Sequence, residues 1–408
     1  MYYVLSAFFF FGFCFIWAKP NIPASSIIPI SNSEKIRTSW GNDEPKKLWS
    51  LNIGSGFSSV LDIGEKSFCQ GYKEGKNTLF CVESTTGKIL WTHEYPCALA
   101  AKNFRGGIRC TPSVYENVIY LPSHEGDLYA LNVDSGKIIW SNNLVRNFGG
   151  VRPTWGFSGS PLLIEGKVIL QTGSPQGSVV ALDAKSGKLI WRAGARQAGY
   201  ASPVLRVDSR EIMIFNQYGL SMHDLDSGRE TKSYQHKTRF GINAAQPLDL
   251  GDKVLLTSGY GKGSALVDVR GSQMRELWVL DSISCHISSP IQIGGYVYGI
   301  HGQIGTRSSY ATLFCLDVNS ARKIWEVRGL GLGSLVAVGD ILVILTEDGE
   351  LILGKSDGRK FAELANFQVL SGKDNWIQPT YYKGRMHCRS SAGEWVCLQM
   401  GVERQRSD

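Results

Sequence analysis

The 408-residue sequence is poor in charge, at 19% charged residues, and it contains no run of lysine or arginine. Its 43 basic and 36 acidic residues are spread along the chain, so the net charge of +7 forms no patch typical of a nucleic-acid-binding protein. Long hydrophobic runs are missing after the first 18 residues, which excludes a protein with several membrane-spanning helices. Because 43% of the residues are hydrophobic, extensive disorder is excluded as well.

The motifs of several chemistries are also missing. The sequence has no adjacent pair of cysteines and no C-x-x-C-H sequence for haem attachment. The seven histidines show no His-x-x-x-His spacing and no EF-hand loop occurs, so we predict no metal site. The Gly-rich segments 54–59 and 259–264 are not followed by a predicted helix, which a phosphate-binding loop needs. We therefore predict no catalytic residue.

The first 18 residues, MYYVLSAFFFFGFCFIWA, are the one long apolar run. Such a run, ending at a small residue before Lys19, is typical of a cleaved signal peptide. The alternative is an uncleaved membrane anchor, for which about 18 apolar residues is the lower limit of length. Both alternatives predict an exported protein of the periplasm or cell envelope, associated with the membrane only through this segment. Residues 19–43 follow as a predicted linker.

Eight cysteines remain after this segment, and an even number in an exported chain permits disulfides. Cys69 and Cys81 are equidistant from Gly75, and Cys388 and Cys397 flank a turn symmetrically, so each pair would face across a hairpin. The alternative is that the cysteines fill buried strand positions, because alanine occupies the equivalent position in other copies of the motif described next. We favour buried thiols.

One motif recurs through the chain with a mean spacing of about 45 residues. The segments 81–91, 130–140, 181–191 and 315–325 read CVESTTGKILW, ALNVDSGKIIW, ALDAKSGKLIW and CLDVNSARKIW. The segment 267–278 is the same motif with one extra residue, and weaker copies without tryptophan occupy 223–234 and 354–364. KLWSL near the N-terminus resembles the last third of the motif. In each full copy a turn leads into a strand that ends at tryptophan, which is expected to dock on the neighbouring repeat. The predicted docking residues are Trp49, Trp91, Trp140, Trp191, Trp278 and Trp325.

A proline runs in step with this motif and precedes an apolar strand. Proline has no amide hydrogen and suits the beginning of an edge strand, so we place it before the first strand of each repeat. Each period then has room for four short strands, and a radial array of such sheets is a β-propeller. These prolines are Pro112, Pro161, Pro203, Pro247, Pro290 and Pro379.

The two chain ends complement each other. The last repeat lacks a fourth strand, whereas PKKLWSL near the N-terminus supplies one. Pairing of the two ends would close the ring and remove an open sheet edge. We therefore predict eight blades of four antiparallel strands, with a seven-bladed ring as the alternative.

The repeats resemble the quinoprotein-like, or PQQ-like repeat, β-propeller proteins. The element ALDxxSGKxIW is similar to that family's tryptophan-docking motif, and the resemblance covers residues 40–400. Segments such as AGYASPV and RGLGLGSLVAVGDILVILTEDGEL resemble a bacterial branch of exported members, similar to the propeller lipoprotein that assists outer-membrane β-barrel assembly. The resemblance implies an all-β propeller over residues 44–400, followed by a polar tail at 401–408.

We predict from these observations a monomeric, non-catalytic propeller that binds envelope or outer-membrane proteins as a scaffold and carries no cofactor. The first alternative is a PQQ-dependent alcohol or sugar dehydrogenase, in which the family holds PQQ with calcium. No residue here matches the family's calcium ligands or its Asp base. The second alternative is a carbohydrate-binding propeller, which rests on aromatic residues expected near the channel.

A ligand site, if present, is expected at the mouth of the central channel, where the segments just before the innermost strands converge. The side chains at these positions are aromatic, cationic or hydrogen-bonding, which suits a polar ligand or a peptide. The alternative is that they only pack the channel. The nine predicted residues are Arg105, Arg109, Trp155, Phe157, Tyr200, Phe240, Asn243, His286 and Trp376.

Overall fold

The structure is a computed structural model that describes residues 35–41, 43–102, 104–206, 209–305 and 310–402. The predicted signal peptide or anchor, residues 1–18, lies outside the described residues, as do residues 19–34 of the predicted linker and 403–408 of the predicted tail. No helix within the described ranges has the length and apolar character needed to cross a membrane.

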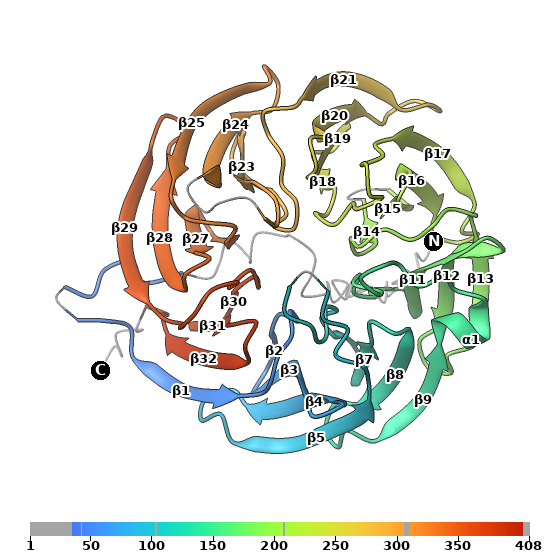
Figure 1. The fold of residues 1–408 in the computed structure, drawn as a ribbon, viewed down its shortest axis with the longest axis horizontal. Helices are drawn as coiled ribbons and strands as arrows, with labels where there is room; N and C mark the ends of the chain where they lie inside the picture. The colour runs from blue at the N-terminus through green and yellow to red at the C-terminus, as the bar shows by residue number, and fades with distance from the viewer. Residues whose placement is uncertain (1–34, 42, 103, 207–208, 306–309, 403–408) are drawn as a thin grey trace, which may run out of the picture.

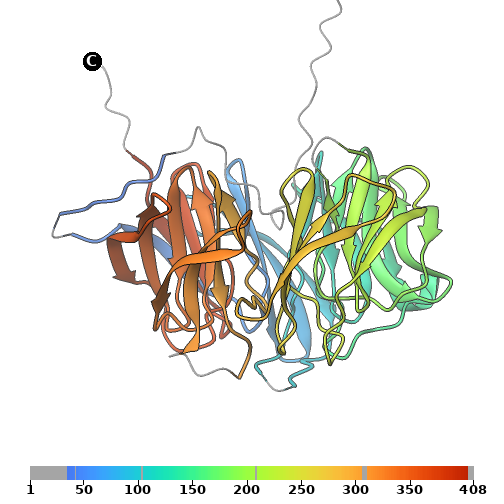
Figure 2. The same ribbon diagram turned by 90° about the horizontal axis from the view of Figure 1, so that it is seen from above.

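In the described part of the chain, eight four-stranded antiparallel sheets stand side by side around a central axis (Figure 1). The side view shows a ring that is shorter along the axis than across it (Figure 2). In each blade the first strand lies nearest the axis and the fourth forms the rim (Figure 1). This confirms the eight-bladed all-β propeller predicted from the repeats.

The strands follow the predicted order from axis to rim. Blades 1 and 2 contain β2 (Leu61–Ile63), β3 (Lys66–Lys73), β4 (Lys76–Glu83), β5 (Ile89–Pro96), β6 (Ser113–Tyr115), β7 (Val118–Pro122), β8 (Asp127–Asn132) and β9 (Ile138–Asn143), followed by helix α1 (Leu144–Phe148). Blades 3 and 4 contain β10 (Leu162–Ile164), β11 (Lys167–Ser174), β12 (Gly177–Asp183), β13 (Leu189–Ala193), β14 (Val204–Leu205), β15 (Glu211–Phe215), β16 (Gly219–Asp224) and β17 (Glu230–Gln235). Blades 5 and 6 contain β18 (Leu248–Asp249), β19 (Lys253–Ser258), β20 (Gly263–Asp268), β21 (Arg275–Leu280), β22 (Ile291–Ile293), β23 (Tyr296–His301), β24 (Thr312–Asp317) and β25 (Arg322–Arg328). Blades 7 and 8 contain β26 (Ser334–Val338), β27 (Ile341–Leu345), β28 (Glu350–Ser356), β29 (Phe361–Gln368), β30 (Thr380–Tyr382), β31 (Arg385–Arg389), β32 (Glu394–Gln399) and β1 (Lys47–Asn52).

The prolines mark the innermost strands, as predicted. Each of the six lies immediately before the first strand of a blade, where its missing amide hydrogen leaves no gap in the sheet. The strands concerned are β6, β10, β14, β18, β22 and β30.

The turn of the repeated motif is built by its own side chains. In blade 3, the Asp183 carboxylate accepts hydrogen bonds from the backbone N–H and the hydroxyl of Ser186, at 2.8 and 2.6 Å. Gly187 then adopts a φ of +69°, which glycine tolerates far better than other residues. The chain turns back into β13 as a result.

The tryptophan at the end of the motif docks on the next blade. Trp140 Nε1 donates to the carbonyl of Ala184 at 2.9 Å, and its ring covers Gly187, where a Cβ atom would lie 2.7 Å from the ring. The glycine is therefore needed both for the turn and for the tryptophan above it. The equivalent bonds run from Trp49 to Ser84 (2.9 Å), Trp91 to Val133 (3.1 Å), Trp191 to Leu225 (3.2 Å) and Trp278 to Val318 (2.9 Å).

Three blades depart from this arrangement. Blade 7 has no tryptophan at the docking position, where the strand register places Ala365. Blade 4 has Lys232 at the tryptophan position, and its Nζ donates to the carbonyl of Val269 at 2.6 Å, so an ammonium group makes the docking bond there. Trp325 in blade 6 packs between Tyr298 and Phe361 instead, and its Nε1 has no hydrogen-bond partner within the described residues.

The ring closes between its two ends. Strand β1 pairs with β32 in antiparallel register, with Leu51 opposite Trp395, which confirms the predicted closure (Figure 1). Part of the predicted linker also packs on the last blades, because Ile36 forms a bridge with Gly401 and both Ile36 and Trp40 are buried. This segment extends the closure beyond β1.

The possibility that Cys69 and Cys81 face each other across a hairpin, which we did not favour, is wrong. Cys69 lies opposite Phe80, one position from Cys81, because the two-residue turn of the hairpin is centred before Gly75 and not on it. A shift of one residue places the two sulfur atoms on opposite faces of the sheet.

The same shift separates the second pair. Cys388 lies opposite Val396, so Cys397 projects from the other face of blade 8. All eight cysteines of the described chain are free and buried. Their burial agrees with the favoured interpretation, in which they fill strand positions in the core.

Candidate functional site

The blades surround a cavity of about 470 Å³. Residues from the segments before β2, β6, β10, β14, β18, β22 and β30 contribute to its wall, so it lies on the ring axis. Its size is within the usual range for small-molecule sites. The wall combines aromatic rings with short polar side chains.

The polar part of the wall is a set of residues directly before the innermost strands. Their hydroxyl groups accept hydrogen bonds from the backbone of the preceding blade, so they join successive blades around the channel. These bonds run from Ser59 N to Thr111 Oγ1 (3.0 Å), Thr111 N to Ser160 Oγ (3.0 Å), Ser160 N to Ser202 Oγ (2.9 Å) and Gln246 N to Ser289 Oγ (2.9 Å). Sequence reasoning missed these residues, although each except Ser59 stands directly before one of the prolines.

The aromatic part of the wall has a cluster on one side. Phe57 stacks on Trp376 with ring centroids 5.8 Å apart, and Phe104 meets both rings edge-on. Elsewhere on the wall Trp155 packs edge-on against Tyr200. The cavity can therefore hold a flat group between apolar surfaces.

The cavity brings together five of the nine residues predicted for a ligand site. The other four lie outside its lining: Phe157 and Asn243 are buried in the protein, whereas Arg105 and Phe240 are exposed. Phe57, Phe104 and Tyr260 line the cavity and were not predicted, since no repeat pattern marks the loops that carry them. The five that line it are Arg109, Trp155, Tyr200, His286 and Trp376.

Asn243 illustrates why position before a strand is not enough. Its Nδ2 donates to the carbonyls of Asn216 and His236, at 2.8 and 3.0 Å, and its Oδ1 accepts from Ser258. Every hydrogen-bonding atom of the amide is thus used to hold loops together. Asn243 has a structural role.

Arg109 is the one side chain of the cavity lining, within the described residues, that carries a positive charge at neutral pH. Its guanidinium lies over Phe104 at 5.3 Å, and Nη2 donates to the carbonyl of Ala100 at 3.0 Å. Nε and Nη1 are buried and have no hydrogen-bond partner in the described structure. Burial lowers the pKa of Arg109, but an arginine of this kind stays charged at pH 7.

His286 is a neutral member of the wall. Burial lowers its pKa to about 4, and Nδ1 accepts a hydrogen bond from the backbone N–H of Ile304 at 3.2 Å. The hydrogen of the neutral ring is therefore on Nε2, which acts as a donor. His286 thus contributes a hydrogen-bond donor and no charge.

The cavity lining does not fit PQQ held by calcium. Calcium takes six to eight oxygen ligands, carboxylates prominent among them. No Asp or Glu occurs among the described residues that line the cavity. The described chain also contains no group of three or more His, Cys, Asp or Glu residues placed to hold a metal ion.

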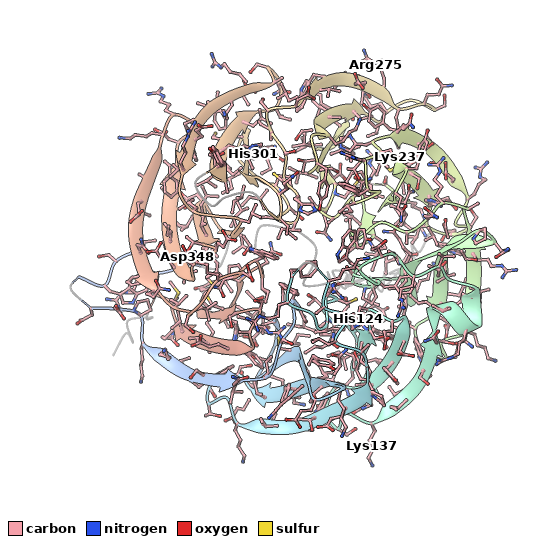
Figure 3. All side chains as sticks on the ribbon, viewed as in Figure 1. His124, Lys137, Lys237, Arg275, His301 and Asp348 are labelled. Carbon is pink, nitrogen blue, oxygen red and sulfur yellow. The ribbon has the colours of Figure 1, made fainter. Side chains whose placement is uncertain are left out.

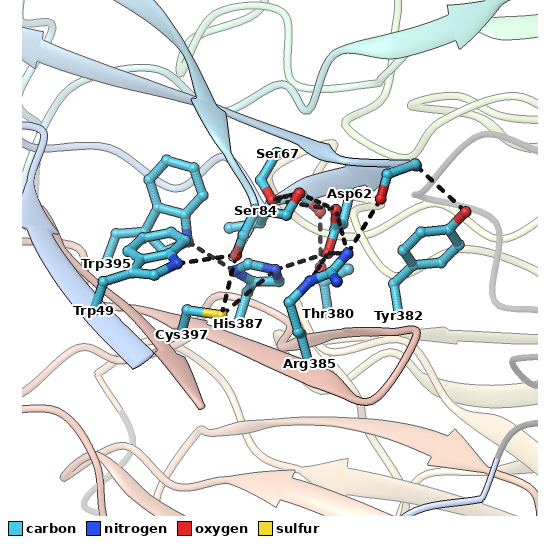
Figure 4. Close-up of polar contacts among 12 residues, drawn as sticks. Trp49, Asp62, Ser67, Ser84, Thr380, Tyr382, Arg385, His387, Trp395 and Cys397 are labelled. Carbon is cyan, nitrogen blue, oxygen red and sulfur yellow. Dashed lines mark hydrogen bonds and ion pairs between the residues drawn. The ribbon is translucent and has the colours of Figure 1, made fainter. Parts of the chain in front are cut away.

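A buried polar network lies at the ring closure (Figure 4). Asp62 of β2 accepts hydrogen bonds from Ser84 at 2.9 Å, from His387 Nε2 at 2.9 Å and from Arg385 at 3.3 Å. Burial alone would raise the pKa of the Asp62 carboxyl, but the hydrogen bond from His387 and the charge of Arg385 hold this pKa below its usual value. The network joins blade 8 to blade 1.

This network contains serine, histidine and aspartate, but it is not a catalytic triad. In a triad the histidine lies between the other two, whereas here Asp62 lies between Ser84 and His387. His387 Nδ1 also accepts from Trp395 Nε1 at 3.2 Å, so neither ring nitrogen is available to a serine. Asp62, Ser84 and His387 are all fully or almost fully buried, and the network is structural.

A cysteine and a histidine approach each other nearer the channel. Cys97 Sγ lies 3.8 Å from both ring nitrogens of His124, which occupies the inner part of the ring (Figure 3). Burial lowers the pKa of His124 to about 4 and raises the pKa of Cys97. Both groups are therefore neutral at pH 7, and the pair provides no thiolate nucleophile.

The rim has a second distinctive surface, which we call the aliphatic rim. In blades 1 to 3 the two residues before the docking tryptophan are aliphatic and between 43% and 53% exposed. Charged side chains such as Lys137 and Arg275 point outward from the same rim (Figure 3). The aliphatic rim consists of Ile89, Leu90, Ile138, Ile139, Leu189 and Ile190.

Comparison with known proteins agrees with the repeats. A family model described as outer membrane protein assembly factor BamB matches residues 75–327, which is more than half of the chain. The chain belongs to this family of PQQ-like repeat propellers. The family membership confirms the resemblance found in the docking motifs.

The individual relatives fall into two groups. Outer membrane protein assembly factor BamB of Moranella endobia is 28% identical over 257 residues, which cover 61% of each chain. The dehydrogenase subunit of the quinone alcohol dehydrogenase of Komagataeibacter europaeus is 29% identical over 119 residues, which cover 27% of this chain and only 16% of that relative.

Solved structures show the same fold in both groups. BamB from Moraxella catarrhalis has a TM-score of 0.62 at 15% identity and covers 89% of this chain and 100% of its own. A europium-containing methanol dehydrogenase has a TM-score of 0.63 at 13% identity and covers 87% of this chain and 85% of its own. The two TM-scores are nearly equal, so the fold alone does not distinguish between the two groups of relatives.

Proposed function

We propose that the protein is a non-catalytic propeller of the cell envelope that binds other proteins and takes part in outer-membrane protein assembly. The relatives named for that process match this chain over more of their own length than the dehydrogenase does. The envelope location rests on those names and on the apolar segment at residues 1–18.

The observation that supports binding most is the aliphatic rim. Exposed aliphatic side chains gathered on one part of a surface are typical of protein–protein contacts. The equivalent positions of blade 4 carry Glu230 and Thr231, so the aliphatic pair is not a general requirement of the fold. The outer edges of β5, β9 and β13 also have backbone groups with no neighbouring strand within their sheets, which suits the addition of a strand from a partner.

Site-specific crosslinking tests this proposal. A photoreactive amino acid replaces Ile139, which precedes the docking Trp140, and the matched control replaces Thr231, which precedes Lys232 in blade 4. In cells that make this protein, we expect crosslinks from position 139 to outer-membrane proteins and none above background from position 231. Equal or absent crosslinking at the two positions would contradict binding through the aliphatic rim.

A second experiment separates loss of binding from loss of fold. The charged variant Ile139→Lys places an ammonium group on an exposed position, so its unfolding temperature is expected to stay close to that of the wild type. The photoreactive amino acid is then placed at Leu90 in blade 1, and Ile139→Lys in blade 2 should reduce the yield of crosslinked partners from that position. An unchanged yield would show that the partner binds elsewhere.

The quinoprotein relatives favour one other candidate function, a PQQ-dependent alcohol or sugar dehydrogenase. Such an enzyme needs a site for quinone and calcium at the channel. The absence of carboxylates from the described cavity lining argues against it. Binding of PQQ with calcium, together with dye reduction, is the test of this alternative.

A further inference from the structure

The cavity has the electrostatics of an anion site. The described lining includes the guanidinium of Arg109 and no carboxylate to balance it. A second cation lies close by, because Lys102 Nζ is 5.7 Å from the ring of Trp155, which lines the cavity. A carboxylate lies behind another part of the wall, because Trp376 Nε1 donates to Glu347 Oε1 at 3.3 Å. In the described lining itself, Arg109 is the one side chain charged at neutral pH.

The hydrogen bonds of Arg109 are incomplete. Only Nη2 is engaged, by the carbonyl of Ala100, while Nε and Nη1 are buried with no partner among the described residues. Nε1 of Trp155 is also buried and unpartnered in the described structure. Buried donors without acceptors are costly, above all on a charged group, so this wall favours a ligand that brings acceptor oxygens.

The neighbouring surface suits a flat apolar group. Phe104 lies beneath the Arg109 guanidinium, and it meets Phe57 and Trp376 edge-on to form the aromatic cluster. A ring next to a carboxylate would reach the aromatic cluster and the guanidinium together. The volume of about 470 Å³ accommodates a small organic acid of this kind.

We propose that the channel cavity binds a small aromatic carboxylate without a metal ion, with the carboxylate paired to Arg109 and the ring packed against Phe104 and Trp376. Arginine suits such a pair because its charged N–H groups make strong hydrogen bonds to a carboxylate. This site lies on the ring axis, so it is separate from the aliphatic rim and does not depend on protein docking there.

Titration of the full chain with indole-3-acetate, in which ligand-observed NMR measures binding, tests the proposal. A ligand of this size with one charged contact is expected to bind with a Kd of roughly 1 mM. The neutral analogue indole-3-acetamide keeps the ring and loses the charge, so its affinity should be at least about tenfold weaker. Addition of EDTA should leave the affinity for the acid unchanged. Equal binding of acid and amide, no saturable binding of the acid, or loss of binding in EDTA would each overturn the proposal.

Two arginines in one loop supply a matched pair of variants. Arg109→Gln removes the charge from the cavity wall, and Arg105→Gln removes a charge from an exposed residue that does not line it. We expect about a tenfold loss of affinity for indole-3-acetate in the first variant and no change in the second. An unchanged affinity in Arg109→Gln, or an equal loss in both, would overturn the assignment of the carboxylate to Arg109. The comparison of acid with amide on the wild-type chain decides the question even if Arg109→Gln does not fold.

Discussion

Substitution of Asp62 by alanine should weaken the contact between blades 8 and 1 at the ring closure and so destabilise the protein. The Asp62 carboxylate is fully buried and accepts hydrogen bonds from Arg385 and His387, whose side chains are 8% and 0% exposed. Removing the carboxylate leaves the buried guanidinium of Arg385 and the buried imidazole N–H of His387 without this hydrogen-bond acceptor. Breaking a buried pair in this way costs about 3–5 kcal/mol. We therefore expect Asp62→Ala to lower the free energy of unfolding by about that amount at pH 7.

Equilibrium unfolding in urea, followed by tryptophan fluorescence, measures this loss. Two of the eleven tryptophans, Trp49 and Trp395, lie edge-on beside the network with ring centroids 5.0 Å apart, so part of the signal comes from the closure. The matched control is Asp226→Ala, since Asp226 is 57% exposed and pairs with Arg210 on the surface. Loss of that exposed pair should cost no more than about 1 kcal/mol.

The effect of Asp62 should also depend on pH. Its folded pKa lies below the unfolded value of about 3.9, so its contribution to stability is complete above that pH. The contribution is lost as the pH falls through the lower, folded pKa. The stability difference between wild type and Asp62→Ala should thus be constant from pH 7 to about pH 5 and shrink below about pH 4. A difference under about 1 kcal/mol at pH 7, or one that grows on acidification, would refute this account of the closure.

Three further predictions concern the blades. Gly187→Ala puts a Cβ atom 2.7 Å from the Trp140 ring at a φ of +69°, so it should lower the free energy of unfolding in urea by about 2–4 kcal/mol. The control Gly166→Ala has a φ of +70° and open space around it, so it should lower this free energy by only about 1 kcal/mol. Equal losses would show that the ring contact is unimportant. Lys232→Met loses both the ammonium bond to the next blade and the ion pair with Glu211 at 3.4 Å, and it should destabilise by about 1.5–3 kcal/mol. An unchanged unfolding curve would contradict docking by lysine. Burial raises the pKa of Cys110 to about 12, and the other cysteines of the described chain are buried as well. We therefore expect no more than one of the nine thiols to react with a thiol reagent at pH 8 before the protein unfolds. Rapid reaction of several thiols in the folded protein would contradict this.

The fold could be predicted because its signals are periodic. Most blades repeat a turn, a docking side chain and a proline, and these fix the number of strands and their order around the ring. Even Lys232, in the weaker copy of the motif at 223–234, stands where other copies have tryptophan and bonds to a carbonyl of the next blade. The closure by β1 followed from a missing strand at one end and an extra one at the other.

Register was harder to predict than strand order. Symmetry about Gly75 suggested that Cys69 faces Cys81, but the turn is centred half a residue earlier. A half-residue change in the centre of a hairpin moves the pairing by one position, and side chains on neighbouring positions point to opposite faces. The sequence around the turn does not specify that centre.

The site could be predicted only in part, since loops do not repeat. Arg109 and Trp376 line the cavity as expected, but Asn243 occupies a comparable place in the sequence and bonds only to neighbouring loops. The closure network had no sequence signal at all, because Asp62 and His387 are 325 positions apart. Contacts of this kind arise from the closed ring and not from any local pattern.

Calorimetric titration of the full chain with PQQ and calcium, followed by dye reduction with simple alcohols and sugars, tests the central claim that this propeller acts by binding and not by catalysis. PQQ is itself a flat carboxylate, so the informative result is its dependence on calcium. The account predicts no calcium-dependent binding and no reduction of dye. Saturable one-to-one binding that requires calcium, with dye reduction that requires substrate, would contradict it and identify the channel cavity as an active site.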